Sequence, residues 1–177
     1  YYGVKLLNVF PNNPLKGMER VRAIYVLFNK NNGEALAIID GTILTKFRTA
    51  AMSALASSYL SKKNSKKLLI MGTGALVPYM ISAHASVRPI DEVFVWGRDY
   101  TKAKKVVSNY KNSKLNLSPI KDFSNISEKM DIISTVTSAK EPFLFSRNLS
   151  KGIHLDLVGA HTIDMMELDS RAFSLGD

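Results

Sequence analysis

A short glycine-containing segment could hold the phosphates of a dinucleotide. It reads Gly72-Thr73-Gly74-Ala75-Leu76, directly after an apolar run at residues 67–71 and before a segment of helical length. In a dinucleotide-binding unit, Gly72 would form the tight turn and Gly74 would let the pyrophosphate approach the backbone. The amino end of the following helix would then face the negative charge of the phosphates. Because Val77 replaces the usual third glycine, a simple strand-to-helix turn is the alternative interpretation.

The next apolar run, residues 93–96, predicts which nucleotide is bound. NAD-binding domains usually end this strand with an acidic residue that binds the adenosine ribose. Here the strand ends in Trp96, Gly97, Arg98 and Asp99 instead. Gly97 leaves room for a phosphate, and Arg98 could pair with it and stack on adenine, which favours NADP(H) over NAD(H). Two alternatives stay open, because Arg98 could be a solvated loop residue and Asp99 could accept a ribose hydroxyl.

Small polar residues end a further apolar run at residues 131–137. Ligands of open parallel sheets bind at the carboxyl ends of the strands, so Thr135, Val136 and Thr137 are candidates for the lining of a nicotinamide pocket. A buried strand with capped ends would explain the same three residues equally well.

Alternating strands and helices are expected to position these candidates. Strands are predicted at residues 67–71, 93–96, 131–137 and 153–159, with a weaker one at 114–117, and helices at 75–87, 100–110 and 122–129. This alternation predicts parallel βαβ units, and we expect an α/β fold with a Rossmann-type, doubly wound parallel sheet in strand order 3-2-1-4-5. We assign this NAD(P)-binding domain to residues 63–177.

The preceding residues differ in character. Apolar runs at 21–28 and 35–40, joined by a turn-rich segment, predict an antiparallel hairpin. A helix is predicted over 45–60, with Thr45 as its N-cap. We assign residues 1–62 to part of a second, antiparallel α+β domain for substrate binding and dimerisation. Its near-continuous apolar strands need a covering surface, so a homodimer is expected.

The bulk composition narrows the possible partners. A hydrophobic share of 46% is typical of a soluble globular protein with a core. The net charge of +9 is spread along the chain, so we expect no nucleic-acid partner and interpret the positive field as attraction for anionic ligands. The absence of cysteine excludes thiolate metal sites, and no metal site is expected.

Further expectations concern location and completeness. No apolar run approaches the roughly 20 residues that span a bilayer, so we expect no membrane partner and a cytoplasmic location. The chain begins with Tyr1 and Tyr2 rather than methionine and ends just after a helix-like stretch. We therefore expect a fragment of a longer protein.

Four segments together resemble the ornithine cyclodeaminase/μ-crystallin family. They are Tyr2-Gly3-Val4-Lys5, residues 43–51, Gly72-Thr73-Gly74-Ala75, and Val158-Gly159-Ala160-His161 with Met166-Glu167-Leu168. Their order and spacing match the family over essentially all 177 residues, leaving out the family's N-terminal segment and its C-terminal portion. The resemblance implies a nicotinamide nucleotide as cofactor and a small amino or imino acid as substrate.

The resemblance also implies roles for single residues. Lys5 corresponds to the lysine that holds the substrate carboxylate, and Arg48 to the arginine that contacts the substrate close to the cofactor. Thr49 and Val158 are expected to contact the cofactor. His161 stands where ornithine cyclodeaminases have an aspartate that acts as acid and base. Histidine can also move a proton near neutral pH, and a hydrogen-bonded loop histidine is the alternative.

The sequence around His161 resembles the branch of the family that reduces cyclic imino acids such as pyrroline-2-carboxylate. We therefore expect an NAD(P)H-dependent imine reductase, in which the cofactor supplies the hydride. Ornithine cyclodeaminase, which converts ornithine to proline plus ammonia, is the first alternative. A non-catalytic nucleotide-binding protein is the second alternative. The presence of Lys5 and Arg48 makes it less favoured, because such a protein needs no carboxylate clamp.

Overall fold

The computed structural model describes residues 1–110, 114–125 and 127–176. The contacts within the chain divide it into two compact units, Tyr1–Thr49 (unit 1) and Ala50–Asp177 (unit 2). The division falls inside helix α1, Gly41–Leu60. The assignment of residues 1–62 and 63–177 to two domains stays a prediction.

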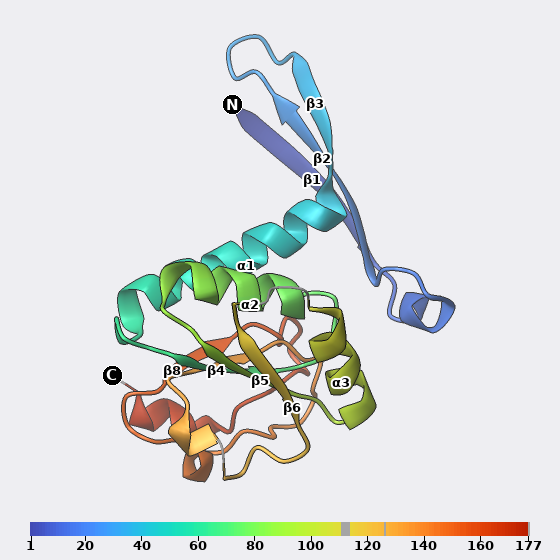
Figure 1. Ribbon diagram of the computed structural model, residues 1–177. Coiled ribbons are helices and arrows are strands. Elements are labelled where there is room, and N and C mark those ends of the chain that lie inside the picture. Colours follow the sequence, from blue (N-terminus) through green and yellow to red (C-terminus); the bar gives the residue numbers. More distant parts are fainter. Residues whose placement is uncertain (111–113, 126, 177) are drawn as a thin grey trace. The chain divides into compact units, whose positions relative to one another are not determined.

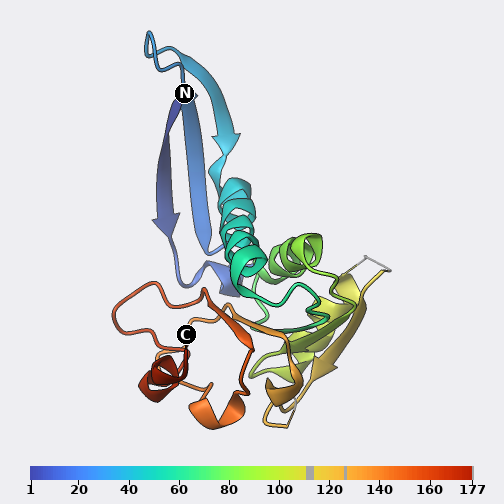
Figure 2. The ribbon, with the colours of Figure 1, turned by 90° about the vertical axis from the view of Figure 1, so that its left-hand side faces the viewer.

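Unit 1 is built on a three-stranded antiparallel sheet in the order β1-β2-β3 (Figure 1 and Figure 2). Its strands are β1 (Tyr2–Val9), β2 (Val21–Phe28) and β3 (Ala35–Asp40), and a short 3-10 turn, η1 (Asn13–Lys16), lies between β1 and β2. The predicted hairpin of β2 and β3 is confirmed with both of its ranges. Strand β1 was not predicted as a strand, and it pairs with β2 along its whole length.

Helix α1 begins four residues before the predicted start. The Asp40 carboxylate accepts hydrogen bonds from the backbone amides of Thr42 (2.8 Å) and Ile43 (3.0 Å), so Asp40 caps the helix. The prediction of Thr45 as N-cap is wrong, because its hydroxyl lies inside the helix and donates to the Gly41 carbonyl. A carboxylate at the end of β3 is the stronger cap, since it also opposes the positive end of the helix dipole. Within the described residues, neither α1 nor any other helix combines the length and the apolar character needed to cross a membrane.

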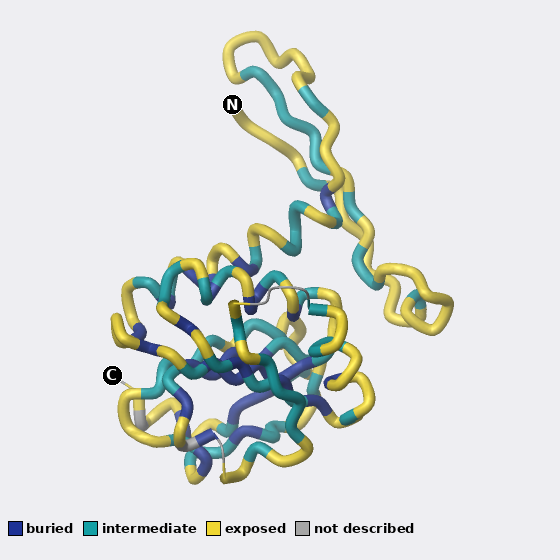
Figure 3. Tube along the Cα trace, in the orientation of Figure 1, coloured by how far each residue is buried: buried dark blue, intermediate teal, exposed yellow. Residues whose placement is uncertain are grey.

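Unit 2 contains a five-stranded, fully parallel sheet in the order β6-β5-β4-β7-β8. Its strands are β4 (Lys67–Met71), β5 (Glu92–Trp96), β6 (Asn116–Ile120), β7 (Ile132–Thr135) and β8 (His154–Leu157). Numbered along the chain from β4, this is the predicted order 3-2-1-4-5, which confirms the Rossmann-type fold. Fully buried positions concentrate on the central strands of this sheet, whereas the strands of unit 1 are exposed or half-buried (Figure 3).

The two faces of the parallel sheet are covered differently. Leu68 and Ile70 pack into a core with helices α2 (Val77–Val87) and α3 (Tyr100–Asn109) and with Ala50 of α1. Leu69 and Met71 point to the opposite face. Among the described residues, that face is covered by irregular segments and the 3-10 turns η2 (Ser127–Lys129), η3 (Ser146–Asn148) and η4 (Ser170–Leu175). Both faces of β4 are therefore buried, which explains its apolar sequence.

Two predicted elements of unit 2 differ from the structure. In place of the helix predicted over 122–129, of which residue 126 lies outside the described residues, the structure has only the turn η2. The Asp122 carboxylate accepts from the amide and the hydroxyl of Ser124, a local bond that competes with helix formation. The strand predicted at 114–117 lies at 116–120 and contains Pro119. A proline lacks the amide that a central strand needs, and β6 is indeed an edge strand.

A buried polar cluster joins α2 to strands β7 and β8. The Asp156 carboxylate lies 3.2 Å from Nε2 of the fully buried His84 and accepts a hydrogen bond from the Ser134 hydroxyl. Burial would raise the pKa of Asp156, but hydrogen bonds from His84, Ser134 and Ser53 outweigh it and hold the pKa below its ordinary value. Burial also lowers the pKa of His154, whose Nε2 atom has no partner. Within the described chain, no three such side chains gather closely enough to hold a metal ion.

Candidate functional site

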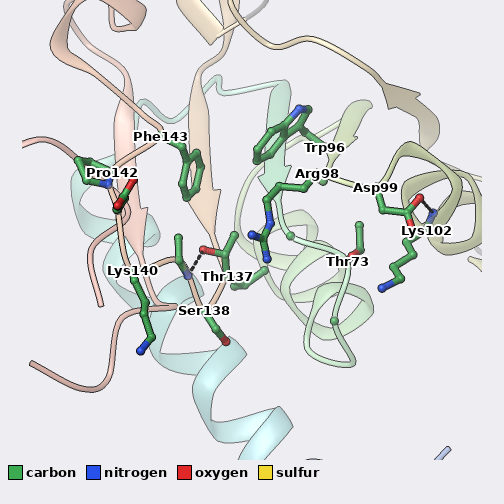
Figure 4. Close-up of a pocket in the computed structure, with 16 residues that line it drawn as sticks. Thr73, Trp96, Arg98, Asp99, Lys102, Thr137, Ser138, Lys140, Pro142 and Phe143 are labelled. Carbon is green, nitrogen blue, oxygen red and sulfur yellow. Dashed lines mark hydrogen bonds between the residues drawn. The ribbon is translucent and has the colours of Figure 1, made fainter. Parts of the chain in front are cut away.

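An open groove of about 1070 Å³ lies at the carboxyl ends of β4, β5 and β7 in unit 2 (Figure 4). Three segments line it, residues 72–74, residues 96–99 with Lys102, and residues 136–143. Ligands of parallel α/β sheets bind at this edge. The structure thus brings together seven residues that the sequence predicted for cofactor binding, namely Gly72, Thr73, Gly74, Gly97, Arg98, Val136 and Thr137.

The two glycines of the first loop differ in what they provide. Gly72 has a φ angle of +146°, and a Cβ atom there would lie 2.7 Å from Cγ2 of Val136. The fold itself therefore requires glycine at this position. A Cβ atom on Gly74 would meet nothing within 4 Å, so the fold leaves open space in front of this backbone. No side chain caps the amino end of α2, and the loop and this helix end together fit the pyrophosphate of a dinucleotide.

The groove is positively charged at the end of β5. The Asp99 carboxylate is the N-cap of α3 and accepts from the amides of Thr101 (2.9 Å) and Lys102 (3.4 Å). Arg98 is exposed, and its side chain extends into the groove beside Thr73 and Thr137 in the view of Figure 4. Glycine at position 97 also prevents a clash within the protein, because a Cβ atom there would lie 2.5 Å from Cγ2 of Thr73.

Aromatic rings line the groove where the end of β5 meets the wall formed by residues 136–143. Trp96 stacks on Phe143 with ring centroids 5.3 Å apart and meets the edge of Phe123 at 4.8 Å. Thr137 lines the groove, whereas Thr135 is fully buried and outside the lining. Trp96 and Phe143 were not predicted as site residues, and apolar residues at the ends of strands carry no signal that separates lining from core.

Glu167 connects the strand ends behind this wall. It is only 3% exposed, and its carboxylate accepts hydrogen bonds from the Thr135 hydroxyl (2.8 Å), the Thr137 amide (2.7 Å) and hydroxyl (2.6 Å), and the Gly159 amide (2.9 Å). In the sequence, Glu167 stood out only as a member of a family motif. Its position between the apolar residues Met166 and Leu168 is the signal that could have singled it out.

A second candidate site lies within unit 1. The Lys5 ammonium on β1 donates to the Thr45 hydroxyl at 3.2 Å. Burial lowers the pKa of Lys5, and the positive charge of Arg48 lowers it further, so the two cations influence one another. In the part of unit 1 that the structure describes, neither cation forms an ion pair with a carboxylate. Two neighbouring cations without an acid are suited to an anion such as a substrate carboxylate.

The remaining predicted residues lie outside the lining of the groove. Thr49 is on α1, Ala75 and Leu76 connect β4 to α2, and Val158 follows β8 and packs on the core. His161 is exposed on the loop after β8, and its Nδ1 atom lies 2.9 Å from the Gly159 carbonyl oxygen. Its Nε2 atom is the ring nitrogen left to exchange a proton with a ligand.

The chain is similar to proteins of known activity. The sequence model of the ornithine cyclodeaminase/mu-crystallin family matches residues 1–175. The Delta(1)-pyrroline-2-carboxylate reductase of Colwellia psychrerythraea is 37% identical over 171 residues, which cover 95% of this chain and 54% of that protein. The chain spans about half the length of the curated relatives that it matches.

The chain is also similar to solved structures of enzymes that act on small amino or imino acids. The structure of Thermococcus litoralis Delta(1)-pyrroline-2-carboxylate reductase in complex with NADH and L-proline has a TM-score of 0.90 and 31% identity, covering 96% of this chain and 53% of that one. An archaeal alanine dehydrogenase dimer with bound NAD has a TM-score of 0.87 and 30% identity, covering 96% of this chain and 52% of that one.

Proposed function

Because this chain belongs to the ornithine cyclodeaminase/mu-crystallin family, we propose that the protein is an NAD(P)H-dependent reductase of a small cyclic imino acid of the pyrroline-2-carboxylate type. One observation carries the proposal. A chain with a dinucleotide groove also has a pair of cations, Lys5 and Arg48, that no carboxylate neutralises within the described residues. A protein that only bound nucleotide would have no use for such a pair.

The residues of the chain have separable tasks in this reaction. Gly74 and the amino end of α2 receive the pyrophosphate, because the backbone there is open and no side chain caps the helix. Lys5 and Arg48 hold the carboxylate of the imino acid and orient its C=N bond. When bound, the reduced nucleotide supplies a hydride to the carbon of that bond. The nitrogen must gain a proton, and the exposed imidazole of His161 is the candidate donor through Nε2.

We further propose that NADP(H) is preferred over NAD(H). The Asp99 carboxylate accepts two backbone amides on Oδ1 as the N-cap of α3, which holds it at the start of that helix and leaves Oδ2 as the oxygen that a ribose hydroxyl could reach. Arg98 extends into the same end of the groove, where Lys102 also contributes to the lining. The two cations outnumber the single acid at this end of the groove, which favours the additional phosphate of NADP(H). The relatives whose structures are cited above hold NADH and NAD, so either nucleotide is a reasonable ligand of the fold.

The proposed assembly is a homodimer formed through unit 1. Large apolar side chains are exposed on both faces of its sheet, among them Leu6 (60%), Leu7 (40%) and Ile38 (77%). Leu6 and Leu7 are adjacent in one strand and so point to opposite faces. A second copy would remove this surface from water. A cytoplasmic location likewise stays a prediction.

The experiment that tests the function is a turnover screen of the full-length protein. Pyrroline-2-carboxylate, ornithine, and pyruvate with ammonia are each offered with both nucleotides, in reduced form for the imines and oxidised form for ornithine. Nucleotide oxidation that depends on pyrroline-2-carboxylate is the expected result. Release of ammonia from ornithine without net consumption of nucleotide would show a cyclodeaminase instead, and tight nucleotide binding without any turnover would show a binding protein.

A further inference from the structure

Glu167 is a buried carboxylate that binds two strand ends at once. Its segment is fixed by backbone bonds, because the Met166 amide donates to the Ala139 carbonyl and Leu168 forms a parallel bridge with Leu144. Among the described residues it has no ion-pair partner, and all four of the hydrogen bonds named above come from neutral donors. A buried acidic side chain that is held only by neutral donors depends on every one of them.

The four donors are divided evenly between the two carboxylate oxygens. Oε1 accepts the amide and the hydroxyl of Thr137, and Oε2 accepts the Thr135 hydroxyl and the Gly159 amide. One oxygen therefore fixes the backbone just after β7, and the other fixes the backbone just after β8. These two backbones touch, because a Cβ atom on Gly159 would lie 2.2 Å from the Thr137 carbonyl oxygen.

The fixed backbone is also a wall of the nucleotide groove. Thr137 lines the groove together with the residues that follow it up to Phe143. This wall follows β7, whereas Arg98 follows β5, and the two strands lie on opposite sides of β4 in the sheet. The side chain of Arg98 reaches toward Thr137 across the groove (Figure 4), and the proposed function gives the β5 side to the adenosine phosphate. The nicotinamide end of an extended dinucleotide would then contact the wall that Glu167 holds.

We propose that Glu167 is a positioning residue for the nicotinamide ring, acting through the backbone of Thr137 and Gly159. This inference rests on the proposed function. Glu167 does not line the groove, so it sets the geometry of hydride transfer without touching the nucleotide. Both oxygens are required as acceptors, because each of them receives a backbone amide that cannot rotate away.

Glutamine at this position shows why two acceptor oxygens matter. If its NH2 group replaced Oε1, it would confront the Thr137 amide, and if it replaced Oε2, it would confront the Gly159 amide. The neighbouring hydroxyls could turn to accept a bond, but a backbone amide cannot. Either orientation therefore pushes one of the two strand ends away from its present place.

The test compares Glu167→Gln with Glu92→Gln in the full-length protein. The Glu92→Gln substitution makes the same chemical change at the amino end of β5, where the Glu92 carboxylate is half-exposed and paired with Lys67. Three quantities are measured for each variant: nucleotide affinity, kcat at saturating nucleotide and imino acid, and energy transfer from Trp96 to the bound reduced nicotinamide. Trp96 is the only tryptophan of these 177 residues and lines the groove. The transfer that disappears in Trp96→Phe is the part that reports on ring position.

For Glu167→Gln we expect a split between binding and chemistry. Nucleotide affinity should change by no more than about threefold, because the pyrophosphate contacts remain. The kcat should fall by about 10- to 100-fold, which is the effect of a misplacement of about 1 Å on a transfer reaction. Energy transfer at saturation should change, and Glu92→Gln should match the parent protein in all three quantities.

The inference is overturned if Glu167→Gln unfolds at a lower temperature while kcat and energy transfer at saturation equal those of the parent, since that is a purely structural role. If Glu167→Gln does not fold, Thr135→Val carries the test. It removes a hydroxyl donor to Glu167 at a residue that is fully buried and outside the lining of the groove, so smaller shifts in the same direction support positioning and unchanged values refute it. Energy transfer can be measured without substrate, so the two proposals can fail separately. If the parent protein reduced no imino acid, the proposed function would be wrong. A change in energy transfer in Glu167→Gln would still support the positioning role.

Discussion

Replacing Gly74 by alanine should separate nucleotide binding from folding. The φ angle of Gly74 is not positive, and a Cβ atom there meets no atom within 4 Å. The added methyl group therefore fits into the protein when no nucleotide is bound. It stands, however, in the space that we assign to the pyrophosphate. Gly72, two residues earlier, is the matched comparison, because there the fold itself excludes a side chain.

The expected magnitudes follow from these surroundings. Gly74→Ala should leave the free energy of unfolding unchanged or raise it by about 0.4–1 kcal/mol, because alanine restricts the unfolded chain. Displacing the phosphate from one charge-assisted backbone bond costs about 1.5–3 kcal/mol, which is roughly 10- to 100-fold in affinity. Gly72→Ala adds backbone strain of about 1–3 kcal/mol at φ +146°. Its contact with Val136 adds about 1–3 kcal/mol more, so it should destabilise the protein by about 2–6 kcal/mol.

Two assays on the same samples check this reasoning. Urea unfolding without nucleotide gives the stability, and titration of the folded protein with reduced nucleotide gives the affinity. If Gly74→Ala binds nucleotide as tightly as the parent protein, the phosphate does not approach the backbone at Gly74 and the assignment of this loop is wrong. If Gly74→Ala is instead strongly destabilised, the description of open space there is wrong.

Three further outcomes are expected. Arg98→Ala should weaken NADPH binding by about 1–3 kcal/mol and NADH binding less, and equal losses in the two titrations would remove the argument for NADP(H). Lys5→Ala should lower kcat/KM for the imino acid by about 10- to 100-fold, mainly through KM, because a charge-assisted bond to the carboxylate is lost. An unchanged kcat/KM, with Lys30→Ala as the exposed control, would refute the carboxylate site. The pKa of His154 is lowered from 6.5 by burial and that of Asp156 is also below its ordinary value, so the folded protein binds fewer protons than the unfolded chain. The free energy of unfolding, measured with urea, should therefore fall as the pH drops below about 6.5, by up to about 1.4 kcal/mol per pH unit for each group. In His154→Gln, the decrease that begins near pH 6.5 should be smaller.

The sequence determined those features that depend on local pattern. Runs of apolar residues predicted β2, β3 and β4 with their boundaries. The strand-helix alternation predicted the parallel order of unit 2, because the rules of right-handed crossover leave few other topologies. The Gly72 turn and the groove at the strand ends follow from the same logic, since the carboxyl ends of parallel strands share one edge. The family resemblance, carried by short motifs, is confirmed by the match over residues 1–175.

The local pattern also failed where a neighbour in sequence changed the outcome. Asp40 belongs to β3 by its apolar context, yet its carboxylate starts α1 and displaces Thr45 from the cap position. The Asp122 side chain bonds to Ser124 and prevents a helix that composition would allow. In both cases a short acidic side chain bonds to nearby backbone amides, and periodicity does not describe such bonds.

Only the tertiary structure decided which distant groups meet. It placed the Glu167 carboxylate on the amides of Thr137 and Gly159, although 30 and 8 residues separate them in the chain. It likewise put the fully buried His84 against Asp156, 72 residues away. A sequence pattern reports whether a residue suits a buried or an exposed position, but a buried charge is stable only beside particular donors, and their identity is fixed by how the strands and loops pack. That is why the fold and the Gly72 turn could be predicted from the sequence, whereas the partners that Glu167 holds could be identified only in three dimensions.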